Sequence, residues 1–325
     1  MSKIKILIPI CNDWQSAFKL LEDIDLQVRD LKHEFSIIIV NDCSTEEKPT
    51  NDFNFNNLKS IKIINMKTNK GHARCNASGL RYIAEHEDYD YIIPMDGDGE
   101  DRPEEITLLI NKVNDYPDKV ITANRVKRSE GSFFKLCYLL HKYLTFVFTG
   151  QSIKFGNFIC LPKFAVNKMI KDKATWSSFS GAVAKLFKDR KSIPSIRGKR
   201  FFGPSKMSFI NLLKHSLSII AVFKMTLLIR SVFFLITYLF LVADNLSLIT
   251  LLPAIGVVIM MISVIILSQK ESILEFENSL ENISNIDNII SYSAFKTSNI
   301  IRIFELFICC VSIGSIELNY KQILE

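Results

Sequence analysis

The sequence has few of the residues that build zinc sites or disulfide frameworks. Its 325 residues include seven cysteines and five histidines, and no two cysteines form a C-x-x-C pair. This usage excludes a disulfide-stapled secreted domain and is typical of a reducing cytosol. The start, MSKIKILIPI, also lacks the long apolar region and small-residue cleavage site of a signal peptide, so we predict a buried strand there.

Acidic residues are nearly absent from the middle of the chain. Residues 131–243 contain 18 Lys and Arg but only two acids, Asp172 and Asp189, which gives a local net charge of +16. The whole chain carries +6, so the remainder sums to −10. Such polarity indicates an anionic partner for the middle of the chain, either a membrane surface or phosphate groups. No nucleic-acid partner is expected.

Charge is missing altogether from residues 246–268, and residues 226–243 contain only Arg230. At about 1.5 Å of rise per residue, the first of these runs would be ~34 Å long as a helix, enough to cross a ~30 Å hydrocarbon core. Arg230 lies one turn inside the second run and could reach the interface. With Asp244 and Asn245 as a turn, the two runs predict a transmembrane helical hairpin.

Two further apolar segments, 132–148 and 209–225, have Lys or His at helical spacing. Each fits an interfacial amphipathic helix or an ordinary core helix. Lysines and Arg230 precede the hairpin and Lys270 follows it, so we expect both hairpin ends in the cytoplasm of a multi-pass inner-membrane protein.

We therefore divide the chain into four parts. These are a cytosolic catalytic domain, an interfacial helix, the hairpin and a cytosolic tail, over residues 1–208, 209–225, 226–268 and 269–325. We expect 271–298 to be helical or loose, and 300–318 to be an amphipathic helix or a third span.

Strand and helix patterns alternate over the first 123 residues. Short β-branched runs predict strands at 4–10, 35–40, 61–64, 90–95 and 119–123, and apolar spacing predicts helices at 14–31, 72–86 and 103–114. This alternation predicts a doubly wound α/β sheet with ligands at the carboxyl ends of its strands.

The segment MDGDGEDRPEE, residues 95–105, follows the fourth predicted strand. Asp96 and Asp98 flank a glycine, and paired carboxylates commonly bridge Mg²⁺ or Mn²⁺ to substrate phosphates. The alternative is a solvated acidic turn. The position after a buried strand favours the metal site.

Three other segments are candidates for substrate contacts. Asp42 follows the second strand and could accept hydrogen bonds from a ribose or base, or simply form a turn. Gly71 and Arg74 lie at a helix start that could face a diphosphate or be an ordinary helix entry; His72 is interpreted as a helix-start residue. The segment RGKRFFGPSKMS, residues 197–208, is suited to phosphate or to non-specific anionic lipid.

In order, IPICND, VNDCST, NKGHARCNASGL, MDGDGEDRPEE, a basic segment and a hairpin resemble glycosyltransferase family 2. In particular, they resemble its polyprenyl-phosphate glycosyltransferases, over roughly residues 3–268. The resemblance implies a GT-A fold with a mixed sheet, and a metal–diphosphate held by Asp96 and Asp98. It also implies a nucleotide-sugar pocket of Pro9, Asn12, Asp42, Gly71 and Arg74. The lipid-phosphate site would contain Arg125, Arg128, Asn157, Arg200, Ser205 and Lys206.

Two departures from that pattern bear on the acceptor. Asn41 replaces a frequent acid, and Asn157 replaces an Asp proposed as a base. An amide cannot take a proton at neutral pH. A phosphate monoester, with a second pKa near ~6, needs no base because it is already anionic.

The sequence thus predicts inverting, metal-dependent transfer of a sugar from a nucleotide diphosphate to polyprenyl phosphate at the cytoplasmic membrane face. Transfer to a lipid or glycan hydroxyl is the first alternative, with Glu100 or Asp101 as base. A non-catalytic membrane-tethered nucleotide-sugar binder is the second. Self-association is possible for such hairpin proteins.

Overall fold

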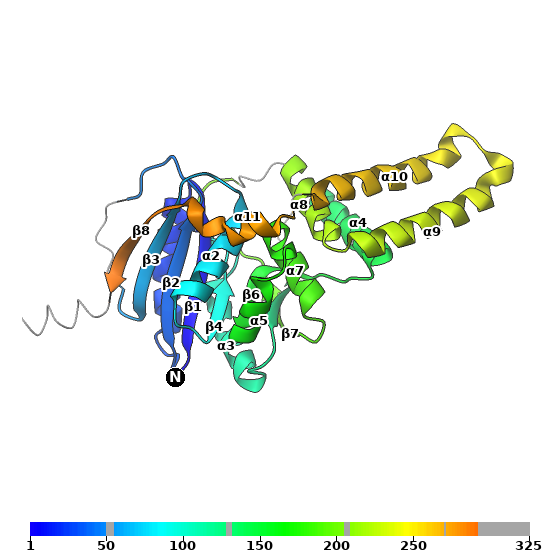
Figure 1. The fold of residues 1–325 in the computed structure, drawn as a ribbon. Coiled ribbons are helices and arrows are strands. Elements are labelled where there is room, and N and C mark those ends of the chain that lie inside the picture. The colour runs from blue at the N-terminus through cyan, green and yellow to red at the C-terminus, as the bar shows by residue number, and fades with distance from the viewer. Residues whose placement is uncertain (50–54, 128–131, 205–208, 270, 292–325) are drawn as a thin grey trace, which may run out of the picture.

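The computed structural model describes residues 1–49, 55–127, 132–204, 209–269 and 271–291. Its centre is a mixed sheet of eight strands in the order β7-β5-β6-β4-β1-β2-β3-β8 (Figure 1). The predicted α/β class with a mixed sheet is confirmed. Residues 300–318, with the question of a third span, lie outside the described residues.

The first half of the sheet is parallel and buried on both faces. It comprises β1 (Lys3–Ile10), β2 (Glu34–Asn41), β3 (Leu58–Met66) and β4 (Tyr91–Pro94). On one face pack α1 (Trp14–Val28) and, after a 3₁₀ turn at Pro103–Glu105, α3 (Ile106–Asp115). On the other face packs α2 (His72–His86). The first four of the five predicted strands form here, the fifth overlaps β5 below, and the three predicted helices match α1, α2 and α3.

The second half of the sheet contains two strands that the sequence did not predict. Between β4 and β5 (Ile121–Lys127) lies β6 (Phe155–Pro162), antiparallel to both, and β7 (Lys191–Ile196) forms the outer edge parallel to β5. Three short helices follow β6 in the chain: α5 (Lys163–Met169), α6 (Ala174–Ser177) and α7 (Phe179–Leu186). The glycine in β6, the lysine in β7 and the proline in each strand obscure any strand periodicity.

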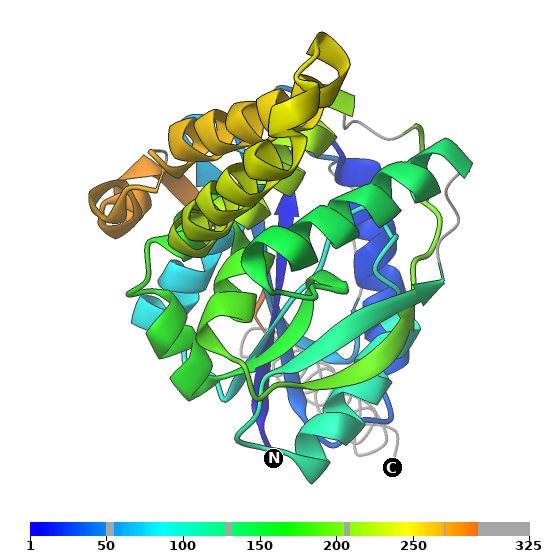
Figure 2. The same cartoon turned by 90° about the vertical axis from the view of Figure 1, so that its right-hand side faces the viewer.

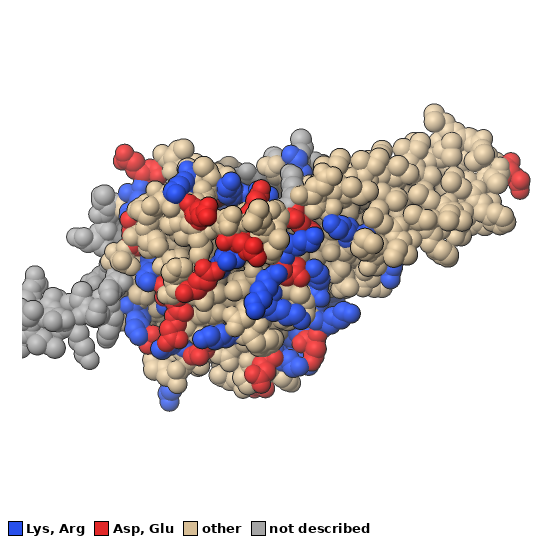
Figure 3. All heavy atoms as spheres, in the orientation of Figure 1, with Lys and Arg blue, Asp and Glu red and all other residues tan. Residues whose placement is uncertain are grey.

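A pair of long helices projects from the domain (Figures 1 and 2). They are α9 (Lys224–Val242) and α10 (Leu248–Ser268), joined by a 3₁₀ turn at Ala243–Asn245. By length and composition both could cross a membrane. In Figure 3 the pair is almost free of charge, and Lys and Arg gather where it joins the domain.

The base of this hairpin is fixed to the domain by two further helices, α4 (Ser132–Thr149) and α8 (Phe209–Ala221). A small apolar core joins all four helices: Phe148, Ile220, Ala221, Leu227, Val257 and Val264. Arg230 of α9 donates to the carbonyl oxygen of Val147 at 2.8 Å, at the end of α4. Farther out the apolar side chains are exposed, and Phe240 is 81% exposed.

After the hairpin the chain returns to the sheet. Helix α11 (Ile273–Glu277) and a turn at Ser279–Asn282 lead into β8 (Ile283–Ser291), which pairs antiparallel with β3. The expectation that 271–298 is helical or loose is wrong for this strand, because the exposed edge of β3 supplies hydrogen-bond partners that the segment lacks on its own. Helix α8, before the hairpin, and strand β8, after it, both pack on the same domain. Both ends of the hairpin therefore lie next to that domain.

Candidate active site

The loop after β4 holds the two predicted metal-binding carboxylates. Between them, Gly97 packs so closely on β1 that a Cβ atom would lie 2.9 Å from Ile10 Cγ2 and 3.2 Å from the Pro9 carbonyl oxygen. Only glycine fits there, and Asp96 and Asp98 consequently lie just beyond the carboxyl end of the buried strand β1. Pro9 itself is a buried residue of β1 and contributes its backbone to this contact.

Asp96 forms a cluster with one histidine and one asparagine. Its Oδ1 is 3.2 Å from His72 Nε2 and 3.4 Å from Asn157 Nδ2, and those two nitrogens are 2.7 Å apart. His72 is the first residue of α2, and Asn157 lies in β6. No sequence motif identified His72 as a site residue. The only available signal was its place at a helix start beyond β3, the edge where ligands bind.

These contacts set the ionisation of the acidic loop. Burial opposes ionisation of Asp96, but the attraction of His72, Arg125 and Arg197 outweighs it and lowers the pKa of Asp96 well below its usual range. Burial and then repulsion from Asp96 raise the pKa of Asp101 to about 7. The same two causes raise the pKa of Asp98. More negative charge is crowded here than the protein alone neutralises.

A short basic loop, residues 197–201, folds directly over the acidic loop. The Gly198 amide donates to the Glu100 carbonyl oxygen at 2.8 Å, and the Phe201 amide donates to the Asp98 carbonyl oxygen at 3.0 Å. Gly99, at φ +86°, lies beneath the Phe201 ring, where a Cβ atom would come within 2.5 Å of the ring. Backbone pairing therefore seats the basic loop on the metal motif.

The arginines of the basic loop pair with these acids. Arg200 donates to Asp98 Oδ2 at 2.8 Å and also pairs with Asp13 at the start of α1. Arg197 pairs with Glu100. The predicted lipid-phosphate residue Arg200 thus lies beside the predicted metal residue Asp98.

Arg125 approaches the same cluster from β5. Its Nη2 is 3.8 Å from Asp101 Oδ1, and its guanidinium lies against Gly156, where a Cβ atom would be 2.7 Å from Nη2. Asp101 in turn accepts the Asp96 amide at 3.0 Å. Three of the predicted lipid-phosphate residues, Arg128, Ser205 and Lys206, lie outside the described residues.

Asp42 organises the neighbouring loops. Its two carboxylate oxygens accept the amides of Lys70 and Gly71, each at 2.8 Å, and Gly71 has φ +88° as the residue before α2. Those amides are therefore engaged within the protein rather than facing a diphosphate. Asn12 Oδ1 accepts the Thr45 amide at 2.7 Å and ties the β1 loop to the β2 loop.

Arg74 lies apart from the acidic cluster. Its guanidinium is 3.4 Å from Glu275 of α11 and 5.1 Å from the centre of the Trp176 ring. Trp176 also donates to Glu275 at 3.0 Å. Because Arg74 is two residues along α2 from His72, it points to a different side of that helix. In this structure it joins the segment after the hairpin to the domain.

The donor set fits a divalent cation only in part. Among the described residues there is no group of three or more His, Cys, Asp or Glu side chains placed to hold a metal ion. Asp96 and Asp98 offer hard oxygen atoms, but Asp98 is held by Arg200 and by the Glu100 amide at 3.0 Å. A cation here would need substrate oxygens and water to complete its shell, as is usual for Mg²⁺.

The family model for glycosyl transferase family 2 matches residues 5–176, which include most of β1, all of β2 to β4, and both aspartates. The chain belongs to this family. The protein is therefore a glycosyltransferase.

Solved structures resemble this glycosyltransferase at low identity. Glucosyl-3-phosphoglycerate synthase from Mycobacterium tuberculosis, in complex with Mn²⁺, UDP-glucose and phosphoglyceric acid, is 12% identical with a TM-score of 0.49. That match covers 70% of this chain and 79% of the synthase. TarS residues 1–349 from S. aureus are 12% identical with a TM-score of 0.46, over 86% of this chain and 91% of TarS.

Proposed function

We propose that this glycosyltransferase moves a sugar from a nucleotide diphosphate onto polyprenyl phosphate at the cytoplasmic face of a membrane. The choice of acceptor rests on the contacts of the acidic loop, whose carboxylates already have partners within the protein. Asp96 faces His72, Asp98 and Glu100 face arginines, and the buried Asp101 accepts a backbone amide. With its carboxylates so occupied, the loop suits an acceptor that is already ionised.

A polyprenyl phosphate is such an acceptor. Its oxygen carries negative charge at neutral pH and attacks the anomeric carbon without giving up a proton to the enzyme. The reaction then requires that two anionic substrates come close together, which positioning and positive charge make possible. Arg125, Arg197 and Arg200 supply that charge at one edge of the sheet. Attack opposite the diphosphate inverts the anomeric configuration.

Asp96 and Asp98 are the residues that would hold Mg²⁺ or Mn²⁺ with the diphosphate. The bound ion supplies Lewis-acid stabilisation of charge on the leaving diphosphate. Arg200, which pairs with Asp98, would lie beside the held ion and is the side chain placed to pair with a phosphate group there. His72 and Asn157 keep Asp96 oriented.

The hairpin supports a membrane location for the acceptor. Both of its helices are apolar and largely exposed, and the chain enters and leaves them on the side of the domain. Exposed apolar surface of this extent favours burial in lipid. A lipid-borne phosphate would then be presented near the domain surface rather than free in solution.

Transfer to a hydroxyl is a second candidate, favoured by His72. Burial opposes protonation of this ring, but the attraction of Asp96 outweighs it and raises the pKa of His72. In its neutral form, oriented by Asp96, such a histidine can accept a proton from a hydroxyl. Mild acid distinguishes the two products, because a sugar phosphodiester is cleaved and an ordinary glycoside is not.

The direct test uses the full chain purified in detergent, undecaprenyl phosphate and a panel of labelled nucleotide sugars. We expect label in an acid-labile lipid product from one donor, dependent on Mg²⁺ or Mn²⁺ and abolished by EDTA. Asp98→Asn should lower transfer at least about 100-fold, because it removes the charge that binds the ion.

Asp118→Asn is the matched control, since it makes the same change at an exposed residue in the turn before β5. Full metal-dependent transfer by Asp98→Asn would overturn the metal assignment. Label in an acid-stable product would instead establish a hydroxyl acceptor.

A further inference from the structure

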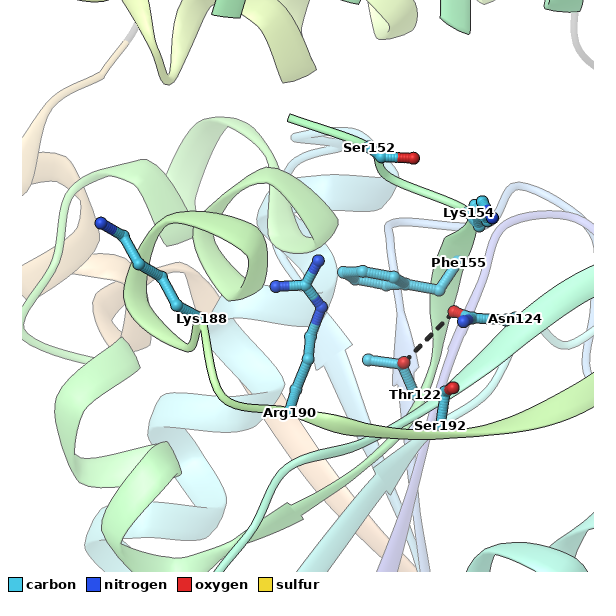
Figure 4. A pocket seen from close by; sticks show the side chains of 8 residues that line it. All are labelled: Thr122, Asn124, Ser152, Lys154, Phe155, Lys188, Arg190 and Ser192. Carbon is cyan, nitrogen blue, oxygen red and sulfur yellow. Dashed lines mark hydrogen bonds between the residues drawn. The ribbon is translucent and has the colours of Figure 1, made fainter. Parts of the chain in front are cut away.

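A cavity of about 310 Å³ lies on the outer part of the sheet, away from the acidic loop. Its lining comes from β5, β6, β7 and the segments that lead into them: Thr122, Asn124, Ser152, Lys154, Phe155, Lys188, Arg190 and Ser192 (Figure 4). The lining contains three cations, hydroxyl groups and an amide, and no acid. We call it the β5–β7 pocket.

The three cations of the β5–β7 pocket are available to a ligand in different degrees. Lys154 and Lys188 are exposed, and within the described part of the chain neither side-chain ammonium group has a hydrogen bond or an ion pair. Arg190 is fixed: it donates to the Phe187 carbonyl oxygen at 2.8 Å and lies 5.1 Å from the centre of the Phe155 ring. In Figure 4, Arg190 stands between Lys188 and Phe155, and Lys154 lies beyond the ring.

The β5 side chains that line the pocket lie on the opposite face of that strand from Arg125. Successive side chains of a strand alternate between faces. Thr122 and Asn124 line the pocket, whereas Arg125, the next residue, approaches Asp101. None of the lining residues belongs to the acidic loop, the basic loop or the predicted lipid-phosphate residues, so a ligand in the β5–β7 pocket would contact different side chains from the sugar acceptor.

The face that carries the pocket also carries the base of the hairpin. Phe155 belongs to the same apolar cluster as α7, and Val222 and Phe223, just before α9, pack against that cluster. Ser152 follows the last residue of α4 by three positions, and α4 is tied to α9 through Arg230. The pocket thus lies near the point where the spanning helices leave the domain.

We propose that the β5–β7 pocket binds the phosphate group of an anionic membrane lipid that is not the sugar acceptor. Lysine side chains without an acidic partner and an oriented guanidinium attract a phosphate, and the hydroxyl group of the exposed Ser192 can donate to its oxygens. This proposal rests on the proposed function in one respect, because a lipid can supply the phosphate only if the domain lies at a membrane. Occupancy would fix the tilt of the domain on the bilayer.

The test measures binding without any nucleotide sugar. The full chain in a neutral detergent is titrated with dihexanoyl phosphatidylglycerol, dihexanoyl phosphatidylcholine or inorganic phosphate, by calorimetry. We expect saturable binding of the phosphatidylglycerol at one site, and at least tenfold weaker binding of the other two. The double variant Lys154→Gln/Lys188→Gln should weaken phosphatidylglycerol binding at least tenfold.

The control is Lys32→Gln/Lys171→Gln, which removes the same charge from two other exposed lysines. Unchanged phosphatidylglycerol binding by the pocket variant, or equal losses of affinity in both variants, would overturn the proposal. If inorganic phosphate bound as tightly as the lipid, the pocket would be assigned to a free anion instead. Asp98→Asn should bind the lipid normally. Failure of transfer with intact lipid binding would therefore contradict only the proposed function.

Discussion

Two groups of cations on this domain have opposite surroundings. Arg197 and Arg200 of the basic loop are paired with acids, whereas Lys154 and Lys188 of the β5–β7 pocket have no partner among the described residues. All four lie within the stretch whose net charge is +16, so they look equivalent in composition. The difference shows that local net charge does not identify an anion site. A cation without a carboxylate partner can bind an anion directly, whereas a paired arginine must first exchange its carboxylate for the ligand.

The largest expected effect is on stability, at a third group of charges in which two lysines pair with one buried acid. Glu87, at the end of α2, is 2.8 Å from Lys5 and 2.5 Å from Lys62, and the Lys5 and Glu87 side chains are 9% and 7% exposed. Glu87→Gln leaves Lys5 buried without a counter-charge. We expect a loss of about 3 kcal/mol in the free energy of unfolding, measured by urea titration in detergent.

The pH dependence of this loss has a definite sign. Burial opposes ionisation of Glu87, but hydrogen bonds from Lys5 and Lys62 outweigh it and lower its pKa below the ordinary 4.5. Its stabilising effect is therefore complete above about pH 4.5 and disappears as pH falls through the lower, folded-state pKa. The difference between wild type and Glu87→Gln should shrink in that acidic range. Glu22→Gln, at an exposed pair, should change stability by less than about 0.5 kcal/mol at any pH.

The next effect concerns the paired arginines. Arg200 contacts both Asp13 and Asp98, and a lysine cannot reach two carboxylates with the same planar geometry. We expect Arg200→Lys to lower kcat/KM for transfer by about tenfold, or ~1.4 kcal/mol. Lys199→Gln, next to it and exposed, should stay within about twofold. Equal losses in both variants would show that the basic loop acts through net charge alone.

The smallest expected effect is a difference in salt dependence between the two groups of cations. The Debye length is about 10 Å at 0.1 M salt and becomes shorter as salt is added. Added salt therefore screens exposed charges strongly and half-buried ion pairs much less. Raising NaCl from about 0.1 M to about 0.5 M should weaken phosphatidylglycerol binding roughly threefold. The loss of transfer caused by Arg200→Lys should keep the same ratio to wild type at both salt concentrations. A constant lipid affinity would indicate that the headgroup charge is not what the pocket recognises.

Much of the parallel half of the fold could be predicted from sequence. β1 and β2 are rich in isoleucine and buried on both faces, and each matches its predicted range closely. The hairpin helices were likewise evident from the uncharged run in α10. Strands β6, β7 and β8 were missed because each includes polar residues and takes its stability from a neighbouring strand distant in sequence.

The candidate site divides in the same way. Asp96 and Asp98 were evident because they follow a buried strand, but the partners of Asp96 come from α2 and β6, far away in the chain. Arg74 was placed at the diphosphate by resemblance, whereas in the structure it contacts α11, which follows the hairpin. No local pattern in residues 69–80 could indicate that contact.

The sequence by itself determined the family, the acidic loop after a buried strand and the apolar hairpin, because each depends on residues adjacent in the chain. Tertiary structure decided which charges are neutralised, where His72 lies and how the segment after the hairpin closes the sheet at β3. Ion pairing and strand pairing depend on distances of a few ångströms between residues as much as 239 positions apart, as for Lys48 and Asp287. Such distances exist only once the chain has folded.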